Sequence, residues 1–522
     1  MNLKHFIFLF ITLIVSSCNS KNNQNPFVDI QVTQSSDAYQ APFFRDKGRK
    51  ARVLQLMPRI ERLFNEYAEA QKYPAFIFGV MVDGELVFSE GKGLINLEQG
   101  TTVSPDSKFH IASMTKSLTA MAIIKLRDEG RLSLEDPVAA YIPELRELEY
   151  LTGDASTIKL FHLLTMSSGF PEDNPWADRH LEDTEKQFRQ LMKGGPAFSN
   201  VPGYAYEYSN LGFAMLGQVI SKVSGKPYQN YIEEAILKPL QMHDTYWEYE
   251  DVPDGELAIG YRWQFENWQK EPMLHTGAFG AIGGLITSLN DFSKYVAYLM
   301  SAWPPRSDAE YGPLKRGSLR EMQTPFFSRL AANAKDTNGR NCPRMSGYGY
   351  GLAIQTDCRG ITKVSHSGGL PGFGSQYTFL PDYGIGIISF ANRTYAGTSA
   401  INQEALELLL AEAKLEPRSL PIANILYERS NQLFRFLQTW DDELADLIFA
   451  DNFYLDYSRE VRKFAFDELD LGTIRSMDGV DPVNQLRGTF IIRGDRGEAE
   501  VFFSLSPESD ARVQALRFRK IK

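Results

Sequence analysis

Cysteine is scarce in this sequence. Only three cysteines occur among 522 residues, which excludes a disulfide-dense scaffold and a cysteine-rich metal domain. Two of them, Cys342 and Cys358, could form one disulfide in an oxidising compartment or remain as two free buried thiols. A strand is predicted between them, over residues 347–355, so the chain would have to double back to bring them within bonding distance.

Runs of basic residues and metal-ligand patterns are also missing. The net charge is -10 and Lys and Arg form no run, which argues against nucleic acid as a partner. The histidines are scattered and form no HExxH pattern, so we expect neither a metal nor another cofactor. Gly277, Gly280, Gly283 and Gly284 do not form a GxGxxG motif and are expected to line a cleft wall instead.

The N-terminus carries one apolar run, residues 6–15, which follows Lys4. It is too short to span a bilayer as a helix, which needs roughly 20 residues, and it is typical of an export signal. Residues 15–18, Val-Ser-Ser-Cys, resemble the lipobox of bacterial lipoproteins. This resemblance implies cleavage before Cys18 and lipidation of its thiol, so we expect an exported protein anchored in the membrane of a bacterial cell envelope.

The order of strand and helix patterns predicts the fold class. At 522 residues and 43% hydrophobic composition, the chain is expected to form one large domain and a smaller one. Strand patterns occur at residues 75–82, 85–89, 347–355, 362–365, 375–380 and 384–391. The region between the early and late strands is helical, which predicts an α/β (α+β) fold: an antiparallel sheet flanked by helices, with an inserted helical region.

Four segments are expected along the chain. Residues 1–17 form the signal peptide, 18–50 a polar tether, 51–415 the large domain, and 416–522 a small C-terminal α+β domain that follows a proline-containing linker. The C-terminal segment has no cluster of catalytic residue types. Chemistry is therefore expected in the large domain, in a cleft between the sheet and the helical region.

A serine and a lysine stand three residues apart at the start of an apolar helical run, residues 117–126. Residues at this spacing share a helix face, so the Ser113 hydroxyl and the Lys116 amine are expected to be neighbours. A desolvated lysine can lose its proton and activate a serine as nucleophile. Alone, the pair is weak evidence, since such pairs more often lie on a solvated helix face.

Two further segments place polar residues in turn or glycine-rich sequence. Tyr208 and Asn210 open a predicted helix, and His366, Gly368 and Gly369 lie at the end of a predicted strand. Each has an ordinary explanation by itself: a half-buried tyrosine, a helix cap, a core histidine and turn glycines. Their combination with the serine and lysine is what suggests a catalytic site.

The three motifs, SxxK, YxN and HxG, resemble those of the serine β-lactamase and penicillin-binding-protein superfamily in order and rough spacing. YSN is similar to the class C branch, and HSG to its esterase and D-amino-acid peptidase relatives. The resemblance covers about residues 58–415, and one departure is Met166, where these proteins usually carry His. It implies a lipoprotein form of the β-lactamase/transpeptidase-like fold.

The resemblance also implies site roles. Ser113 is the expected nucleophile, Lys116 and Tyr208 share proton abstraction, Asn210 orients the lysine and the substrate, and the backbone N–H groups of Ser113 and Gly369 hold the oxyanion. His366 and Gly368 are expected to contact the substrate.

A neutral histidine suits a substrate carboxylate poorly, so esters or D-amino-acid amides and peptides are the expected substrates. The alternatives are a β-lactamase or D-Ala-D-Ala carboxypeptidase, and a non-catalytic envelope binding protein on the same fold.

Overall fold

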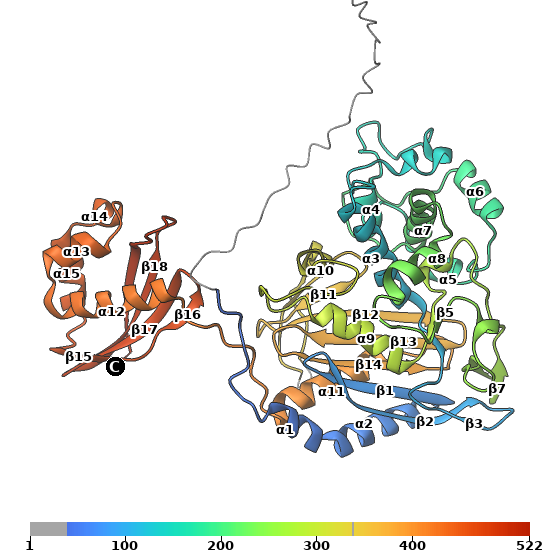
Figure 1. Cartoon of the computed structure of the whole chain (residues 1–522), viewed down its shortest axis with the longest axis horizontal. Helices are drawn as coiled ribbons and strands as arrows, with labels where there is room; N and C mark the ends of the chain where they lie inside the picture. Colours follow the sequence, from blue (N-terminus) through green and yellow to red (C-terminus); the bar gives the residue numbers. More distant parts are fainter. Residues whose placement is uncertain (1–38, 337–338, 522) are drawn as a thin grey trace, which may run out of the picture. The chain divides into compact units, whose positions relative to one another are not determined.

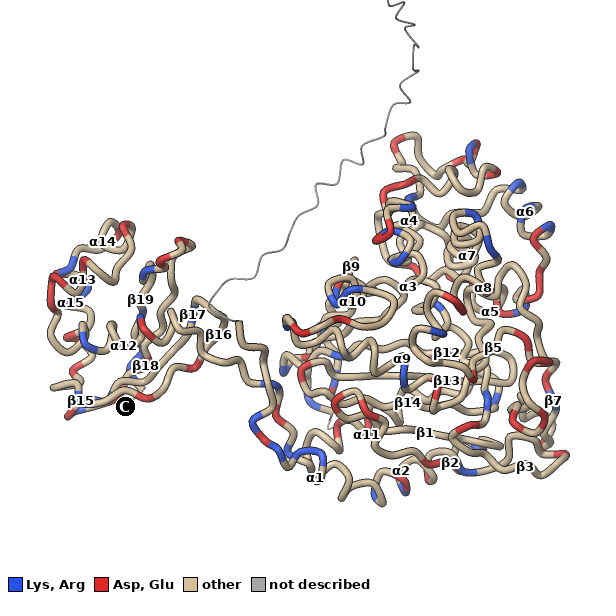
Figure 2. Tube along the Cα trace, in the orientation of Figure 1, with Lys and Arg blue, Asp and Glu red and all other residues tan. Residues whose placement is uncertain are grey.

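The computed structural model describes residues 39–336 and 339–521. The predicted signal peptide, the lipidation site at Cys18 and most of the predicted tether lie outside these residues. None of the helices within the two ranges has the length and apolar character that a membrane-spanning segment requires. Lys and Arg are interspersed with Asp and Glu along the trace of the large domain (Figure 2).

A nine-stranded antiparallel sheet forms the centre of the large domain (Figure 1). The strands, in sheet order, are β3 Thr101–Thr102, β2 Glu85–Asn96, β1 Ala75–Val82, β14 Ile385–Ala391, β13 Phe373–Leu380, β12 Thr362–Leu370, β11 Ala353–Thr356, β10 Arg344–Tyr348 and β9 Phe326–Ala331. Strand β1 pairs with β14 over Phe76 to Val82, so the two ends of the domain meet in one sheet. The predicted antiparallel sheet built from both chain ends is confirmed.

Helices lie before, between and after these strands. They are α1 Arg49–Gln55, α2 Met57–Ala70, α3 Thr115–Asp128, α4 Leu160–Leu164, α5 Asn174–Ala177, α6 Glu185–Gly194, α7 Asn210–Ser224, α8 Tyr228–Ile232, α9 Leu289–Met300, α10 Arg316–Met322 and α11 Ser399–Glu412. Short strands accompany them: β4 Phe109–His110, β8 Ile286–Thr287 and β5 Thr245–Tyr246 form one small sheet, and β6 Tyr261–Gln264 and β7 Asn267–Lys270 another. Most of the helices therefore belong to the predicted insertion.

Helices cover both faces of the large sheet (Figure 1). Every residue of β1 is buried, and alternate side chains of a strand point to opposite faces. Phe76 and Phe78 pack in one apolar cluster with residues of α2 and α11, while Ile77 and Met81 belong to a second cluster with residues of α3 and α9. Because both faces of β1 are buried, its sequence is a continuous apolar run and does not alternate between apolar and polar residues.

Helix α7 follows the sequence prediction closely. It was expected over residues 210–223 and to end at Gly225. The Ser209 side chain accepts a hydrogen bond from the Gly212 N–H at the N-terminus, and Gly225 has the left-handed φ of +76° that favours glycine after a helix. Capping residues thus determined both ends of the helix that begins at Asn210.

The single strand predicted over residues 347–355 is wrong, because the chain folds there into a hairpin of β10 and β11. Gly351 has a φ of +69°, and a Cβ on it would lie 2.8 Å from the Lys116 carbonyl oxygen. Glycine is needed for both reasons. The hairpin brings together Cys342 and Cys358, whose Cα atoms lie 5.0 Å apart and whose sulfurs are joined in a disulfide.

The predicted tether, residues 18–50, includes residues that form backbone hydrogen bonds and the start of a helix. Phe43 and Ser419 exchange two backbone hydrogen bonds, of 3.1 and 2.8 Å, and the Arg418 guanidinium lies over the Phe44 ring. Helix α1 begins at Arg49, inside the segment assigned to the tether. Residues on either side of the predicted domain, including the start of the predicted C-terminal segment, are therefore hydrogen-bonded to each other.

The C-terminal part of the chain has an apolar core of its own. Its elements are α12 Asn424–Thr439, α13 Asp442–Ile448, α14 Phe453–Asp456, α15 Arg459–Asp467, β15 Ile474–Met477, β16 Asp481–Asn484, β17 Arg487–Gly494, β18 Gly497–Leu505 and β19 Val513–Lys520. The amphipathic pattern over residues 453–469 predicts one helix, but the structure has α14 and α15 there, because Ser458 caps a new helix by accepting a hydrogen bond from the Val461 N–H.

Candidate active site

Ser113 lies in a short 3₁₀ turn, Ala112–Met114, directly before α3. The residue before it, Ala112, has a left-handed φ of +49°. A non-glycine residue in this region is strained, and such strain persists where the surrounding structure fixes it, often at functional sites. The serine is therefore presented at the N-terminal end of α3, where the helix dipole favours negative charge.

Lys116 is completely buried one turn further on. Its Nζ lies 3.0 Å from Ser113 Oγ and donates a 2.8 Å hydrogen bond to the carbonyl oxygen of Ile282. Burial lowers the pKa of Lys116 to about 7, against the opposing effect of Asp178 and Asp173. The predicted neighbourhood of hydroxyl and amine is present, and the amine titrates near neutral pH.

Tyr208 completes the group around Ser113. The Lys116 Nζ lies 5.2 Å from the centre of its ring. Burial raises the pKa of Tyr208 far above its usual value of 10, although a hydrogen bond with Ser113 acts in the opposite direction. The phenol is consequently protonated at neutral pH, which suits it to donate a proton more than to remove one from the resting enzyme.

Met166 holds the loop that carries Tyr208. Its carbonyl oxygen accepts a 2.8 Å hydrogen bond from the Glu207 N–H, and its sulfur accepts one of 3.3 Å from the Ser209 N–H. Met166 itself has a left-handed φ of +54°. The residue that departs from the family pattern therefore supports Tyr208 from both sides.

Asn210 is held differently from the expectation. Its Nδ2 donates a 2.9 Å hydrogen bond to Asn174 Oδ1, and its backbone N–H donates one of 2.7 Å to Asp173 Oδ1. The structure thus shows it fixed by Asp173 and by the first residue of α5, and among the described hydrogen bonds none joins it to Lys116. Its Oδ1 is buried and has no hydrogen-bond partner among the described residues, which leaves one acceptor available.

His366 is neutral in this setting. Its Nδ1 donates a 2.7 Å hydrogen bond to the Ser367 carbonyl oxygen, which leaves Nε2 as the acceptor for the Tyr348 hydroxyl at 2.9 Å. Burial and the nearby Lys116 lower the pKa of His366 to about 3. Its ring centre lies 6.5 Å from that of Tyr208, so it belongs to the site as an uncharged group.

Strand β12 passes close to the serine turn. A Cβ on Gly368 would lie 2.2 Å from the carbonyl oxygen of Ile111, so only glycine allows this approach. Gly369 follows and pairs with Gly374 of β13. The strand and the turn that carries Ser113 are thereby side by side, as an oxyanion hole made from their backbone N–H groups requires.

Several residues near the site were not predicted from the sequence. Asp173 caps α7 by accepting hydrogen bonds from the Asn210 and Leu211 N–H groups, and Asp178 accepts one of 3.1 Å from the Tyr395 hydroxyl. Burial raises the pKa of Asp178 to about 6, while Lys116 lowers it. Residues 171–178 are rich in Pro, Asp and Asn, a composition typical of a turn. Nothing in this segment indicates that it contacts the YxN motif or the residue Tyr395.

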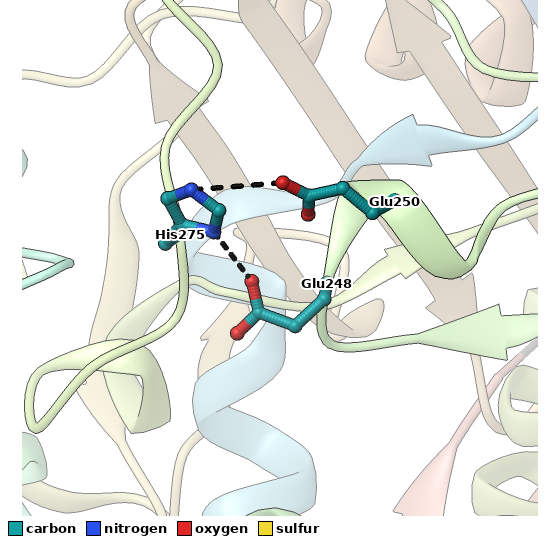
Figure 3. Close-up of side chains that lie close together, drawn as sticks. All are labelled: Glu248, Glu250 and His275. Atoms are coloured by element: carbon teal, nitrogen blue, oxygen red, sulfur yellow. Dashed lines mark hydrogen bonds and ion pairs between the residues drawn. The ribbon is translucent and has the colours of Figure 1, made fainter.

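One group of side chains outside this site has the residue types of a metal centre. His275 lies between Glu248 and Glu250, and the potential ligand atoms are all within 4.8 Å of one another (Figure 3). Its Nδ1 is 2.9 Å from Glu248, its Nε2 is 3.1 Å from the Tyr249 hydroxyl, and Glu248 raises the pKa of His275. Because both ring nitrogens are engaged, the arrangement suits a protonated imidazole between two carboxylates better than a metal ion.

Comparison with known proteins gives one matching family model. The model named Beta-lactamase matches residues 60–412. Protein flp of Staphylococcus aureus (strain MW2) is 28% identical over 319 residues, which are 60% of this chain and 58% of that protein. The unguisins hydrolase ungD′ of Aspergillus campestris is 25% identical over 351 residues, 64% of this chain and 61% of that protein. The chain thus matches less than two thirds of the length of these curated relatives.

A solved structure shows the same fold. The octameric penicillin-binding protein homologue from Pyrococcus abyssi aligns with a TM-score of 0.58 at 23% identity and covers 88% of this chain and 99% of that chain. At this identity the likeness concerns the fold alone. The predicted sheet and helical insertion therefore occur in a known architecture.

Proposed function

This chain belongs to the β-lactamase family of serine hydrolases, and on that premise we propose that it cleaves esters or amides through an acyl-enzyme on Ser113. The observation that carries the proposal is the buried Lys116, whose Nζ lies 3.0 Å from Ser113 Oγ and whose pKa is lowered to about 7 by burial. A neutral amine at this distance can accept the serine proton. A relative whose name describes a hydrolase supports the same class of activity.

The residues suggest how acylation proceeds. Ser113 Oγ attacks the substrate carbonyl carbon while its proton passes to Lys116 Nζ, and the negative charge moves to the carbonyl oxygen, where the N–H groups of Ser113 and Gly369 stabilise it. When the carbonyl reforms, the bond to the leaving group breaks. Tyr208, protonated at neutral pH, gives its proton to the leaving group, and Lys116 returns the proton to Tyr208.

Deacylation repeats these steps with water in place of Ser113. Lys116 Nζ takes a proton from the water as it attacks the acyl carbon. The bond from that carbon to Ser113 Oγ then breaks, Tyr208 gives its proton to Oγ, and Lys116 returns the proton to Tyr208. The unpartnered Oδ1 of Asn210 could accept a hydrogen bond from an N–H group of the substrate. Amide-bearing substrates would use that acceptor, and simple esters would not.

Substrate charge is the first testable consequence. Because His366 is uncharged and both its nitrogens are engaged, we expect kcat/KM for a p-nitrophenyl ester or a D-amino-acid p-nitroanilide to exceed that for a chromogenic cephalosporin carrying a carboxylate by about tenfold or more. The three substrates are compared by absorbance with one enzyme preparation. A cephalosporin turned over as fast as the others would show that carboxylates are recognised and would favour a β-lactamase.

The N-terminal sequence supports the further proposal of export and lipid anchoring. A bacterial host supplied with an alkynyl fatty acid should incorporate it into the wild-type protein and into Cys358→Ser, and should not incorporate it into Cys18→Ser. The measurement is in-gel fluorescence of membrane and soluble fractions. Equal labelling of Cys18→Ser would contradict the lipobox interpretation and leave the hydrolase proposal untouched.

A further inference from the structure

Tyr395, which follows strand β14, has an unusual backbone conformation. Its φ is +51°, in the left-handed region that aromatic residues rarely adopt, and its N–H donates a 3.2 Å hydrogen bond to the Leu370 carbonyl oxygen. A strained conformation of this kind persists only when neighbouring structure fixes it, and it is a known feature of ligand-binding sites. The neighbours of the Tyr395 side chain are therefore the residues that fix this conformation.

The Tyr395 ring lies directly against Gly369. A Cβ on Gly369 would be 3.0 Å from Tyr395 Cδ1, so the ring occupies the place that a side chain at this position would take. The tyrosine is nevertheless 47% exposed. One surface of the ring therefore lies on the strand that carries the proposed oxyanion donor, while another part is open to solvent or to a ligand.

The hydroxyl end of the same side chain reaches the helical region. It donates a 3.1 Å hydrogen bond to Asp178, which is only 3% exposed. The Asp178 N–H donates to the Asn174 carbonyl oxygen, and the Asn174 side chain holds Asn210. Tyr395 thus connects the sheet to the segment that supports the YxN motif.

Tyr208 and Tyr395 lie near different positions along β12. Tyr208, the proposed proton donor to the leaving group, lies beside His366, whereas Tyr395 lies beside Gly369, three residues and about 10 Å further along the strand. A carbonyl held by the N–H groups of Ser113 and Gly369 would place its leaving group toward His366. Its acyl group would then point toward Tyr395.

We propose that Tyr395 forms an aromatic wall of the acyl-binding pocket and selects substrates whose acyl group carries a planar, apolar ring, with Asp178 as the residue that positions it. The proposal rests on the acyl-enzyme function proposed above and names its substrate class. Stacked or edge-to-face contact with the phenol ring supplies the preference. Asp178 is too buried to meet the substrate and acts through the Tyr395 hydroxyl.

Two esters with the same leaving group test the proposal. We expect Tyr395→Ala to lower kcat/KM for p-nitrophenyl phenylacetate about tenfold and to change that for p-nitrophenyl acetate less than about twofold. Tyr395→Phe keeps the ring and should retain most of the preference, while Tyr395→Leu keeps bulk without the ring and should lose it. Tyr427→Ala, at a similarly exposed tyrosine in α12, is the matched control and should alter neither rate.

Asp178→Asn provides a readout that a purely structural role would not produce. The Asp178 carboxylate raises the pKa of Lys116, so its neutralisation should move the acid limb of the kcat/KM profile to lower pH. Removal of a charged acceptor also weakens the bond to Tyr395, and KM for the phenylacetate ester should rise more than kcat falls. A pH profile identical to that of the wild type, with both esters unchanged, would contradict the positioning role.

The outcomes separate the two proposals. If the wild type hydrolyses both esters through Ser113 but Tyr395→Ala and Tyr395→Leu reduce both rates equally, or neither, the aromatic wall is wrong and the acyl-enzyme function stands. If the wild type hydrolyses neither ester and no serine is acylated, the proposed function fails, and the acyl pocket with it. Melting curves of each variant identify any loss of folding. If Tyr395→Ala and Tyr395→Leu do not fold, the results for Tyr395→Phe and Asp178→Asn decide whether the aromatic wall is correct.

Discussion

Ser113→Ala is expected to lower kcat/KM for a p-nitrophenyl ester by about 10⁴-fold or more. The substitution removes the atom proposed to form the acyl-enzyme, and loss of a nucleophile that acts with its base removes most of the rate enhancement. A fluorophosphonate probe should label the wild type and fail to label the variant. Rates are measured by release of p-nitrophenol and labelling by mass spectrometry of the tryptic peptide that contains Ser113.

Ser318→Ala serves as the control for this experiment, since the Ser318 hydroxyl bonds to Asp128 at the surface. It should be labelled and active like the wild type. If the wild type itself is neither labelled nor active on esters, amides or a cephalosporin, the non-catalytic binding role is favoured. Residual activity of Ser113→Ala at the wild-type level would place the nucleophile elsewhere.

The second large effect on kcat/KM is expected for Lys116, both when the residue is substituted and when the pH is changed. In the wild type, kcat/KM should rise about tenfold per pH unit below pH 7 and level off above it, because the neutral amine is the proposed base and burial lowers its pKa to about 7. With an exposed lysine as the base, the rise would continue to about pH 10 before it levels off. Lys116→Met should lower kcat/KM about 10³-fold and abolish the limb.

Lys125→Met is the matched control, since Lys125 lies on the same helix and pairs with Glu129 at its end. Its rate and pH profile should match those of the wild type. His366 cannot produce the limb, because its pKa is lowered to about 3, and Asp178, with a pKa raised to about 6, is distinguished by Asp178→Asn. An acid limb near pH 7 that remains unchanged in Lys116→Met would show that Lys116 is not the base.

Local patterns in the sequence were sufficient for much of the fold. The C-terminal end of helix α7 was predicted because Gly225 stops the helix, an effect that depends on adjacent backbone only. Its N-terminal cap is Ser209, whereas Asn210 was the cap that the sequence suggested. Asp83 and Gly84, between the strand patterns at residues 75–82 and 85–89, likewise favour a tight turn by their own backbone preferences, and they join β1 and β2. The hairpin at Gly351 was not predicted. The run over residues 347–355 has the pattern of a single strand, and the contact of Gly351 with α3, which requires the turn, is not visible in the sequence.

In the candidate site, too, contacts between residues close in sequence were predicted and contacts between distant residues were not. Ser113 and Lys116 were expected to be neighbours because a spacing of three residues fixes them on one helical turn. The contacts of Asn210 with Asn174 and of Asp178 with Tyr395 were not foreseen, and the second joins residues 217 positions apart in the chain. Sequence spacing carries no information about pairs of this kind unless a motif contains both partners.

The sequence by itself determined which residue types are available: a serine beside a lysine, a tyrosine at a helix start, and a histidine where a lysine would bind carboxylates. Only the tertiary structure decided their protonation and orientation. Burial among distant segments lowers the pKa of Lys116 and raises that of Tyr208, and burial together with the nearby Lys116 lowers the pKa of His366 and keeps it neutral. The physical reason is that desolvation and Coulomb interactions depend on distance in space, which the order of residues along the chain does not specify.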